Sequence, residues 1–159
     1  MTASPPAVPA PPPPGERVHA TALAIGEAGL LLRGPSGAGK SRLALALIGL
    51  ARLRGRFARL VGDDRVALET RAGRLLARPV PPLEGLIERR GLGLTPEPHL
   101  DAAVIRLIVD CGTPPQRMPE ADDMVESLQT VVLPRIRVEG RPEDADLVLA
   151  ALALFEETA

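Results

Sequence analysis

Apolar and polar positions along the first part of the chain form short runs typical of strands and one longer run typical of a helix. Residues 18–25 (VHATALAI) and 30–33 (LLLR) predict two strands joined by a GEAG turn. Residues 41–54 are apolar almost all round and stop before Gly55, which predicts a buried helix. Residues 57–64 (FARLVGDD) then predict a buried strand that ends in two acids.

The remainder of the chain predicts further strands and a second helix. Strands are expected at 65–69, 74–77, 102–110 and 128–140, a proline-stiffened loop at 78–85 and a glycine-punctuated segment at 86–94. Residues 142–157 carry proline and acids in their first turn and then a long apolar run, which predicts a helix. Because strands, loops and helices alternate early, we expect the α/β class, with a mixed β-sheet and flanking helices in a single domain over residues 16–159.

Residues 1–15 (MTASPPAVPAPPPPG) differ from the rest in composition. They hold seven of the 18 prolines and no charged side chain. Polyproline segments stay extended and cannot build a packed core, so we expect a disordered proline-rich arm. The alternative is a polyproline ligand that docks on a partner.

Composition narrows the function classes. The net charge is −1, so no overall field attracts nucleic acid or an anionic membrane. Aromatic residues make up 1% of the chain, with no Trp or Tyr to stack on a base. No apolar run approaches the roughly 18 to 20 residues of a membrane span. The single Cys111 excludes an intrachain disulfide and a cysteine-based zinc site, and it favours a cytoplasmic location.

A glycine-rich loop follows the second predicted strand. RGPSGAGKSR at 33–42 contains the one lysine of the chain, whose other 18 basic residues are arginines. Residues 34–41 match the P-loop pattern G-x-x-x-x-G-K-[ST], between a predicted strand and a predicted helix as the motif requires. The residues expected to bind the nucleotide are Gly34, Pro35, Ser36, Gly37, Ala38, Gly39, Lys40 and Ser41.

Each residue type in this loop suits phosphate chemistry. Glycines let successive backbone N–H groups turn inward around an anion, and the helix N-terminus adds partial positive charge. Ser41 offers a small hydroxyl to Mg²⁺. Lys40 is a compact charge able to reach the β- and γ-phosphates, whereas the wide arginine fork would not fit the narrow loop. The alternative is a glycine-rich turn that simply connects a strand to a helix.

Two adjacent acids, Asp63 and Asp64, end the strand predicted at 57–64. In P-loop proteins an acid at such a strand end reaches the magnesium shell. Successive strand residues point to opposite faces, so one acid can hold the metal while the other faces an incoming hydroxyl as general base. The residues do not say which acid takes which role. The alternative is two solvated turn aspartates followed by Arg65.

These blocks together resemble a known family. Residues 18–48, then RLVGDD at 59–64 and PVPPLEGLIERRGLGL at 79–94, are similar to the catalytic domain of HPr kinase/phosphorylase, a bacterial enzyme that acts on a serine of the phosphocarrier protein HPr. The resemblance covers about residues 17–150, and it is to a short form that consists of the C-terminal catalytic domain.

The resemblance implies roles for several residues. The family's histidine near the first strand corresponds to His19, close to the phosphates and metal. Its P-loop corresponds to residues 34–41, and its aspartate pair to Asp63 and Asp64. One of the pair is implied as the base that deprotonates the target serine and, in reverse, as the acid.

The family's E-x-R-G-x-G signature corresponds to Glu88, Arg90, Gly91 and Gly93. It implies Glu88 in the metal shell with Ser41 and Asp63, and Arg90 in phosphate handling. Read from the residues alone, His19 would be a structural histidine, and Glu88 with Arg90 a surface charge cluster.

The resemblance implies ATP- and Mg²⁺-dependent phosphorylation of a serine on an HPr-type phosphocarrier, with phosphate-dependent dephosphorylation as the reverse activity. It also implies a homo-oligomer, a hexamer. The alternatives are a small-molecule P-loop kinase and a non-catalytic nucleotide sensor.

The chain departs from the family pattern at three places. Arg42 stands where an acid commonly follows the P-loop serine, residues 51–59 add a basic stretch, and Gly62 replaces a common alanine. The stretch at 51–59 is expected to be a solvated turn or a dock for an acidic partner. We assign no chemistry to His99, to Cys111 or to the acidic segment 118–126, each of which we expect in a loop or on the surface.

Overall fold

The computed structural model describes residues 3–5 and 15–158. The arm predicted at residues 1–15 therefore lies almost wholly outside the described residues, and its disorder stays a prediction. The strands are β1 (Glu16–Val18), β2 (Ala20–Ile25), β3 (Ala28–Arg33), β4 (Ala58–Gly62), β5 (Val66–Arg71), β6 (Arg74–Pro79), β7 (Leu86–Arg89), β8 (Gly93–Pro96), β9 (Ala103–Cys111), β10 (Val125–Leu128) and β11 (Val131–Val138). The helices are α1 (Lys40–Leu53) and α2 (Ala145–Thr158), with 3-10 turns at Ala121–Met124 and Pro142–Asp144.

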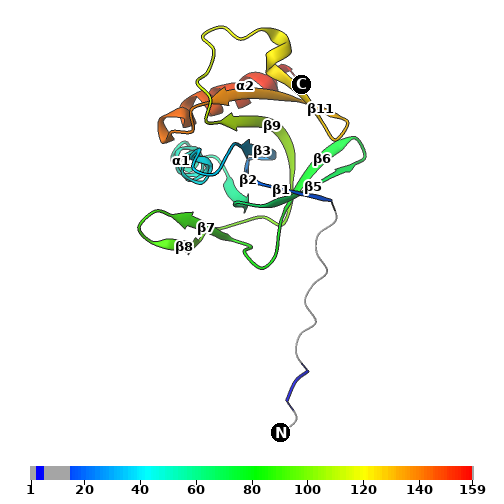
Figure 1. Ribbon diagram of the computed structural model, residues 1–159, viewed down its shortest axis with the longest axis vertical. Coiled ribbons are helices and arrows are strands. Elements are labelled where there is room, and N and C mark those ends of the chain that lie inside the picture. Colours follow the sequence, from blue (N-terminus) through cyan, green and yellow to red (C-terminus); the bar gives the residue numbers. More distant parts are fainter. Residues whose placement is uncertain (1–2, 6–14, 159) are drawn as a thin grey trace.

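Nine strands form one curled, mixed sheet in the described part of the chain (Figure 1). Its order is β1-β5-β6-β9-β3-β2-β4, with β11 also paired to β9 and β10 paired to β11. Both β3 and β11 run parallel to β9, and β2 is antiparallel to β3 and to β4. Strands β7 and β8 form a separate hairpin. The expected α/β class with a mixed sheet and flanking helices is confirmed.

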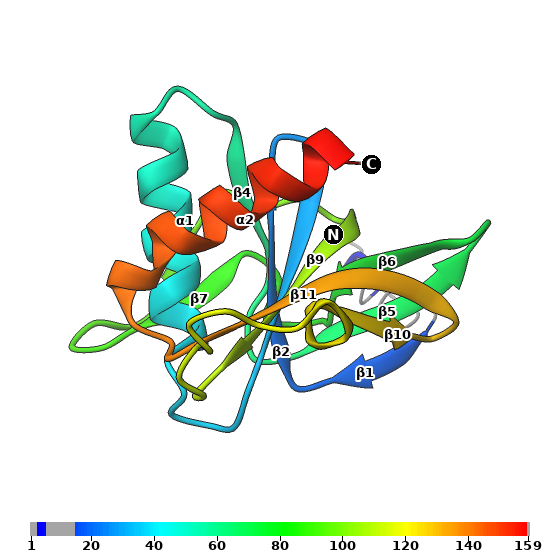
Figure 2. The ribbon, with the colours of Figure 1, turned by 90° about the horizontal axis from the view of Figure 1, so that it is seen from above.

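The core lies on both faces of the central strands. Helices α1 and α2 cover one face (Figure 2), where Leu30 and Leu32 of β3 are fully buried. The side chain of Leu31 points to the opposite face and packs with residues of β5 and β6, including Leu68. Burial on both faces explains why β3 is a continuous apolar run rather than an alternating one.

Several elements differ from the sequence-based expectations. The strand predicted at 128–140 is β11, but it begins only at Val131, because Gln129 and Thr130 adopt φ of +47° and +69° and reverse the chain after β10, a strand that was not predicted. The glycine-punctuated segment predicted at 86–94 contains β7 and the first residues of β8, so it makes up most of the β7–β8 hairpin. Strand β1 was not predicted. Strand β9 ends at Cys111, which is buried at 3% exposure rather than lying on the surface.

Among the described helices, none combines the length and the apolarity that crossing a bilayer requires.

Candidate active site

The glycine-rich loop joins β3 to α1 at the carboxyl end of β3. Gly39 is the N-cap of α1 with φ of +89°, and no described side chain caps it. The first turn of α1 contains no acid. The first N–H groups of the helix therefore keep their partial positive charge, which suits an anionic ligand.

Tight backbone packing explains two of the loop glycines. A Cβ on Gly34 would stand 2.5 Å from the carbonyl oxygen of Cys111, and a Cβ on Gly39 would overlap the carbonyl oxygen of Gly140. By contrast, nothing described lies within 4 Å of a Cβ on Gly37, so that glycine faces open space. The end of β9 and the segment after β11 thus pack against the backbone of the loop, while the loop tip at Gly37 faces open space.

Lys40 lies at the start of α1 and is buried, at 6% exposure. Its Nζ donates to the carbonyl oxygens of Gly34 at 2.7 Å and Pro35 at 3.1 Å. These two hydrogen bonds link the end of the loop to its start. They hold the Lys40 ammonium group beside the open side of the loop.

Asp63 follows β4 and accepts two hydroxyl hydrogen bonds on one carboxylate oxygen. Ser41 Oγ donates to Asp63 Oδ1 at 2.7 Å and Thr21 Oγ1 donates at 2.8 Å. The other oxygen, Oδ2, lies 3.4 Å from the backbone nitrogen of Glu88. Thr21 is fully buried and was missed from the sequence, although it is a polar residue in the apolar strand β2.

Asp64 points to a different partner. Its Oδ1 lies 2.8 Å from His19 Nε2, and both side chains are exposed. Asp64 has φ of +66°, a left-handed backbone that costs a residue with a side chain about 1–2 kcal/mol. This turn directs the two neighbouring carboxylates to opposite partners, Asp63 to Ser41 and Asp64 to His19.

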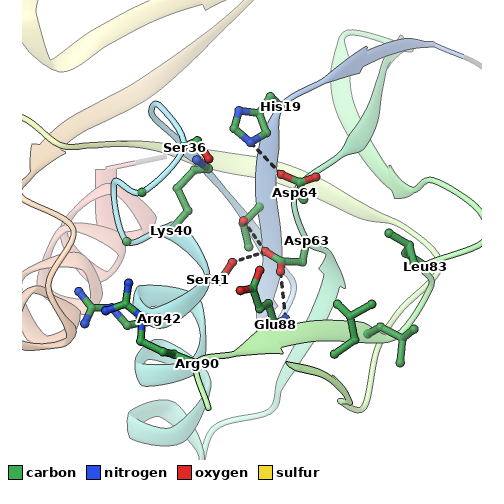
Figure 3. A pocket seen from close by; sticks show the side chains of 15 residues that line it. His19, Ser36, Lys40, Ser41, Arg42, Asp63, Asp64, Leu83, Glu88 and Arg90 are labelled. Carbon is green, nitrogen blue, oxygen red and sulfur yellow. Dashed lines mark hydrogen bonds and ion pairs between the residues drawn. The ribbon is translucent and has the colours of Figure 1, made fainter. Parts of the chain in front are cut away.

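One cavity of about 400 Å³ joins these groups (Figure 3). It is lined by His19, Lys40, Ser41, Asp63, Asp64, Glu88 and Arg90, together with Ser36, Gly37 and Gly39 of the loop. Gly34, Pro35 and Ala38 lie in the loop but do not line the cavity. The structure therefore brings together most of the site residues predicted from the sequence.

The hairpin of β7 and β8 forms the wall opposite the P-loop. It contributes Glu88 and Arg90, and apolar side chains that include Leu94. Figure 3 shows Arg42 and Arg90 at one end of the cavity and Leu83 at the other. Two guanidinium groups at one end make that end basic, which suits a phosphate.

Ser41, Asp63 and Glu88 could hold a magnesium ion. Mg²⁺ keeps several waters and takes one or two protein carboxylates, so a hydroxyl and two carboxylates around an open cavity fit it. Within residues 3–5 and 15–158 there is no group of three or more His, Cys, Asp or Glu side chains arranged for a metal.

A cluster of four charged side chains lies behind the loop. Arg33, directly before Gly34, donates to Asp110 at 2.8 and 3.0 Å and to Glu126 at 2.5 and 2.9 Å. Arg135 Nε donates to Asp110 Oδ2 at 2.5 Å. This cluster was not predicted from the sequence, because its members come from four different strands, β3, β9, β10 and β11.

The pKa values of Arg33, Asp110 and Glu126 are shifted in favour of their charged forms. The hydrogen bonds from Arg33 lower the pKa of Glu126 and, in return, raise the pKa of Arg33. Burial alone would raise the pKa of Asp110, but its bonds to Arg33 and Arg135 lower it below the ordinary value. The cluster therefore fixes the start of the loop to the ends of β9 and β10 by ion pairs.

The basic stretch at 51–59 pairs with acids of its own chain. Arg52 lies 3.2 Å from Glu97 and Arg54 lies 2.7 Å from Asp146. These pairs occupy guanidinium groups that an acidic partner would need.

The fold and the cavity thus define an α/β protein with a glycine-rich anion cradle beside a pair of carboxylates. Comparison with known proteins specifies the family. The family model described as HPr Serine kinase C-terminal domain matches residues 13–96, so the chain belongs to that family.

Curated relatives match about half of this chain. It is 38% identical over 81 residues to HPr kinase/phosphorylase of Mycoplasma mycoides, covering 51% of this chain and 24% of that protein. It is 40% identical over 81 residues to HPr kinase/phosphorylase of Clostridium beijerinckii, covering 51% of this chain and 25% of that protein. The chain spans about a quarter of the length of the relatives it matches.

A solved structure confirms the fold over a longer stretch. The Hpr(Ser) kinase/phosphatase from Coxiella burnetii superposes with a TM-score of 0.69 at 24% identity, covering 89% of this chain and 99% of that one. At this sequence identity the match shows a similar fold and nothing further.

Proposed function

We propose that this chain uses ATP and Mg²⁺ to phosphorylate a serine on an HPr-type phosphocarrier protein, with phosphate-dependent dephosphorylation of that serine as the reverse reaction. One observation carries the proposal: a single cavity combines the open P-loop with two carboxylates that face different partners. Membership of the HPr Serine kinase C-terminal domain family supports it.

Residues 34–41 would hold the phosphates of ATP. The N-terminus of α1, which no described side chain caps, would attract the anion. Lys40 would donate to phosphate oxygens in place of the loop carbonyl oxygens to which it now donates. Ser41, Asp63 and Glu88 would hold Mg²⁺. When bound, that ion neutralises charge on the phosphate oxygens.

Asp64 is the better candidate for the general base. Asp63 is engaged by the hydroxyls of Ser41 and Thr21, whereas Asp64 is exposed and bonded to His19. In the forward direction the hydroxyl oxygen of the acceptor serine would bond to the γ-phosphorus of ATP as its proton passes to the Asp64 carboxylate, and the bond from that phosphorus to the β-phosphate oxygen would break to release ADP. In the reverse direction inorganic phosphate would attack the phosphorus of phosphoserine, the bond from phosphorus to the serine oxygen would break as protonated Asp64 returns its proton to that oxygen, and pyrophosphate would leave. His19 would hold the carboxylate in position.

A nucleotide sensor without phosphoryl transfer is the second candidate. Arg42 lines the cavity where family members commonly carry an acid, and it adds positive charge beside the proposed metal position. This charge would favour nucleotide binding over metal-assisted transfer. Two further predictions remain proposals: the cytoplasmic location, which rests on the composition, and the hexamer, which the resemblance implies.

Two variants separate binding from transfer. Lys40→Ala should abolish ATP binding, because it removes the buried charge of the loop. Asp64→Asn should leave ATP binding within about twofold and slow transfer by about 10²–10⁴-fold, the usual contribution of a general base. Asp101→Asn is the matched control, since Asp101 is exposed and does not line the cavity.

The assay incubates each variant with labelled ATP and an HPr-type carrier. Label on the carrier serine supports the kinase, label on a metabolite points to the small-molecule kinase, and binding without transfer points to the sensor. Normal transfer by Asp64→Asn would contradict the assignment of the base.

A further inference from the structure

A second cavity, of about 310 Å³, lies away from the candidate active site and shares no lining residue with it. Its walls come from β11, from α2 and from the segment between β9 and β10, which arches over both (Figure 1). Nothing in the proposed kinase chemistry uses this cavity.

The body of the cavity is apolar. Ile136 and Met124 line it together with Leu147, Ala150 and Ala151 of α2. Its volume is at the lower end of the usual range for small-molecule sites, about 300–1,000 Å³. The occupant that fits is therefore a small molecule with a hydrocarbon body.

Three arginines line this cavity against a single acid, Asp123, so its net positive charge favours an anion. Arg117 and Arg137 line it, and neither makes an ion pair with any described residue. Arg137 is half-buried, and a charge withdrawn from water without a partner is costly. Arg135 also lines the cavity but is bound to Asp110. A single carboxylate on the ligand would supply the missing counter-charge.

Two contacts connect this cavity to the P-loop. Arg135 reaches from the cavity to Asp110, which also accepts bonds from Arg33 at the start of the loop. After β11 the backbone of Gly140 packs against the loop so closely that a Cβ there would overlap the carbonyl oxygen of Ala38. Through these two contacts, β11 and the residues after it are connected to Arg33 before the loop and to Ala38 within it.

We infer that this cavity binds a small amphipathic monocarboxylate, and that its occupancy weakens nucleotide binding at the P-loop. The two carboxylate oxygens bind Arg137 and Arg135, so the ligand competes with Asp110 for Arg135 and loosens the ion pairs that fix Arg33. The regulatory half of this inference rests on the proposed function, since it needs ATP to bind residues 34–41. The binding half does not.

Isothermal titration of hexanoate and octanoate into the full chain tests the binding half. Affinity should rise about fourfold for each added methylene, and octanol should bind about tenfold more weakly than octanoate. Arg137→Met, which keeps the apolar stem, should weaken octanoate about tenfold. Arg106→Met is its control, because Arg106 is an exposed arginine outside the cavity.

A second pair of variants fills the cavity. Ala150 and Ala153 are both exposed on α2, but only Ala150 lines the cavity. Ala150→Phe should abolish octanoate binding, and Ala153→Phe should leave it unchanged. Octanoate binding that is absent in the wild type, or unaffected by Ala150→Phe, would overturn the site. If the wild type does not bind octanoate and forms an oligomer that Ala150→Phe disrupts, the face is an interface between copies of the chain, which would overturn the site equally.

The regulatory half is tested by titrating ATP with and without saturating octanoate. We expect the affinity for ATP to fall by at least about fivefold, and Ala150→Phe to remove this effect while binding ATP normally. An unchanged or higher affinity for ATP would overturn the coupling. A chain that binds octanoate but never binds ATP would instead refute the proposed function and leave the site standing.

Discussion

Replacing Gly140 with alanine tests whether the chain after β11 shapes the P-loop. At Gly140 φ is +95°, and an added Cβ would stand 3.1 Å from the carbonyl carbon of Ala38 and closer still to its oxygen. The left-handed backbone costs about 1–2 kcal/mol for a residue with a side chain, and overpacking a tight contact costs about 1–3 kcal/mol. We therefore expect the free energy of unfolding to fall by about 2–5 kcal/mol, a large share of the roughly 5–15 kcal/mol of a typical domain.

Gly55→Ala is the matched control for this substitution. Gly55 has φ of +75°, but no described atom lies within 4 Å of its added Cβ, so only the backbone cost of about 1–2 kcal/mol applies. Urea unfolding followed by circular dichroism gives both losses, and calorimetry with an ATP analogue gives the affinities. Gly140→Ala should also weaken nucleotide binding, since it displaces Ala38, whereas Gly55→Ala should not. Equal losses of stability, with normal nucleotide binding by Gly140→Ala, would refute the reasoning.

Three further substitutions or treatments probe the surroundings of the site. Burial raises the pKa of the Cys111 thiol to about 12, so iodoacetamide at pH 8 should label it about a thousandfold more slowly in the folded chain than in urea; equal rates would show an accessible thiol. The pKa values of Asp110 and Glu126 are lowered on folding, so their stabilisation is complete above their ordinary values near 4 and is lost as the pH falls through the folded values. Unfolding free energies measured between pH 6 and 2 should therefore fall less steeply in Asp110→Asn, and parallel curves would contradict this. Thr21→Val removes a buried donor to Asp63 and should cost about 1.5–3 kcal/mol in urea unfolding, where a loss below about 0.5 kcal/mol would show that the bond is dispensable.

The parts of the fold that depend on local pattern could be predicted from the sequence. The apolar run of β3, the helix α1 and the glycine loop between them each have a local signature, and so does the strand that leads to Asp63. Their succession indicated the α/β class, which the structure confirms. Hairpin β10–β11 has no such signature, because its turn uses left-handed Gln129 and Thr130 rather than glycine.

Contacts between distant positions could not be predicted from local pattern. Arg33 and Glu126 are 93 positions apart, and only the pairing of β3 with β9, of β9 with β11 and of β11 with β10 brings their elements together. His19 and Glu88 entered the predicted site through the resemblance, since nothing local distinguishes them from structural or surface residues. The packing of Gly140 against the loop is likewise a property of the assembled sheet.

The central claim is that Asp64, beside the P-loop, prepares a protein serine to receive the terminal phosphoryl group of ATP. The most direct measurement is mass spectrometry of an HPr-type carrier after incubation with ATP, Mg²⁺ and this chain, because it reports the amount and the position of the phosphate together. We expect one phosphoryl group on one serine with the wild type and almost none with Asp64→Asn. An unmodified carrier with the wild type, or the same modification with both chains, would contradict the claim.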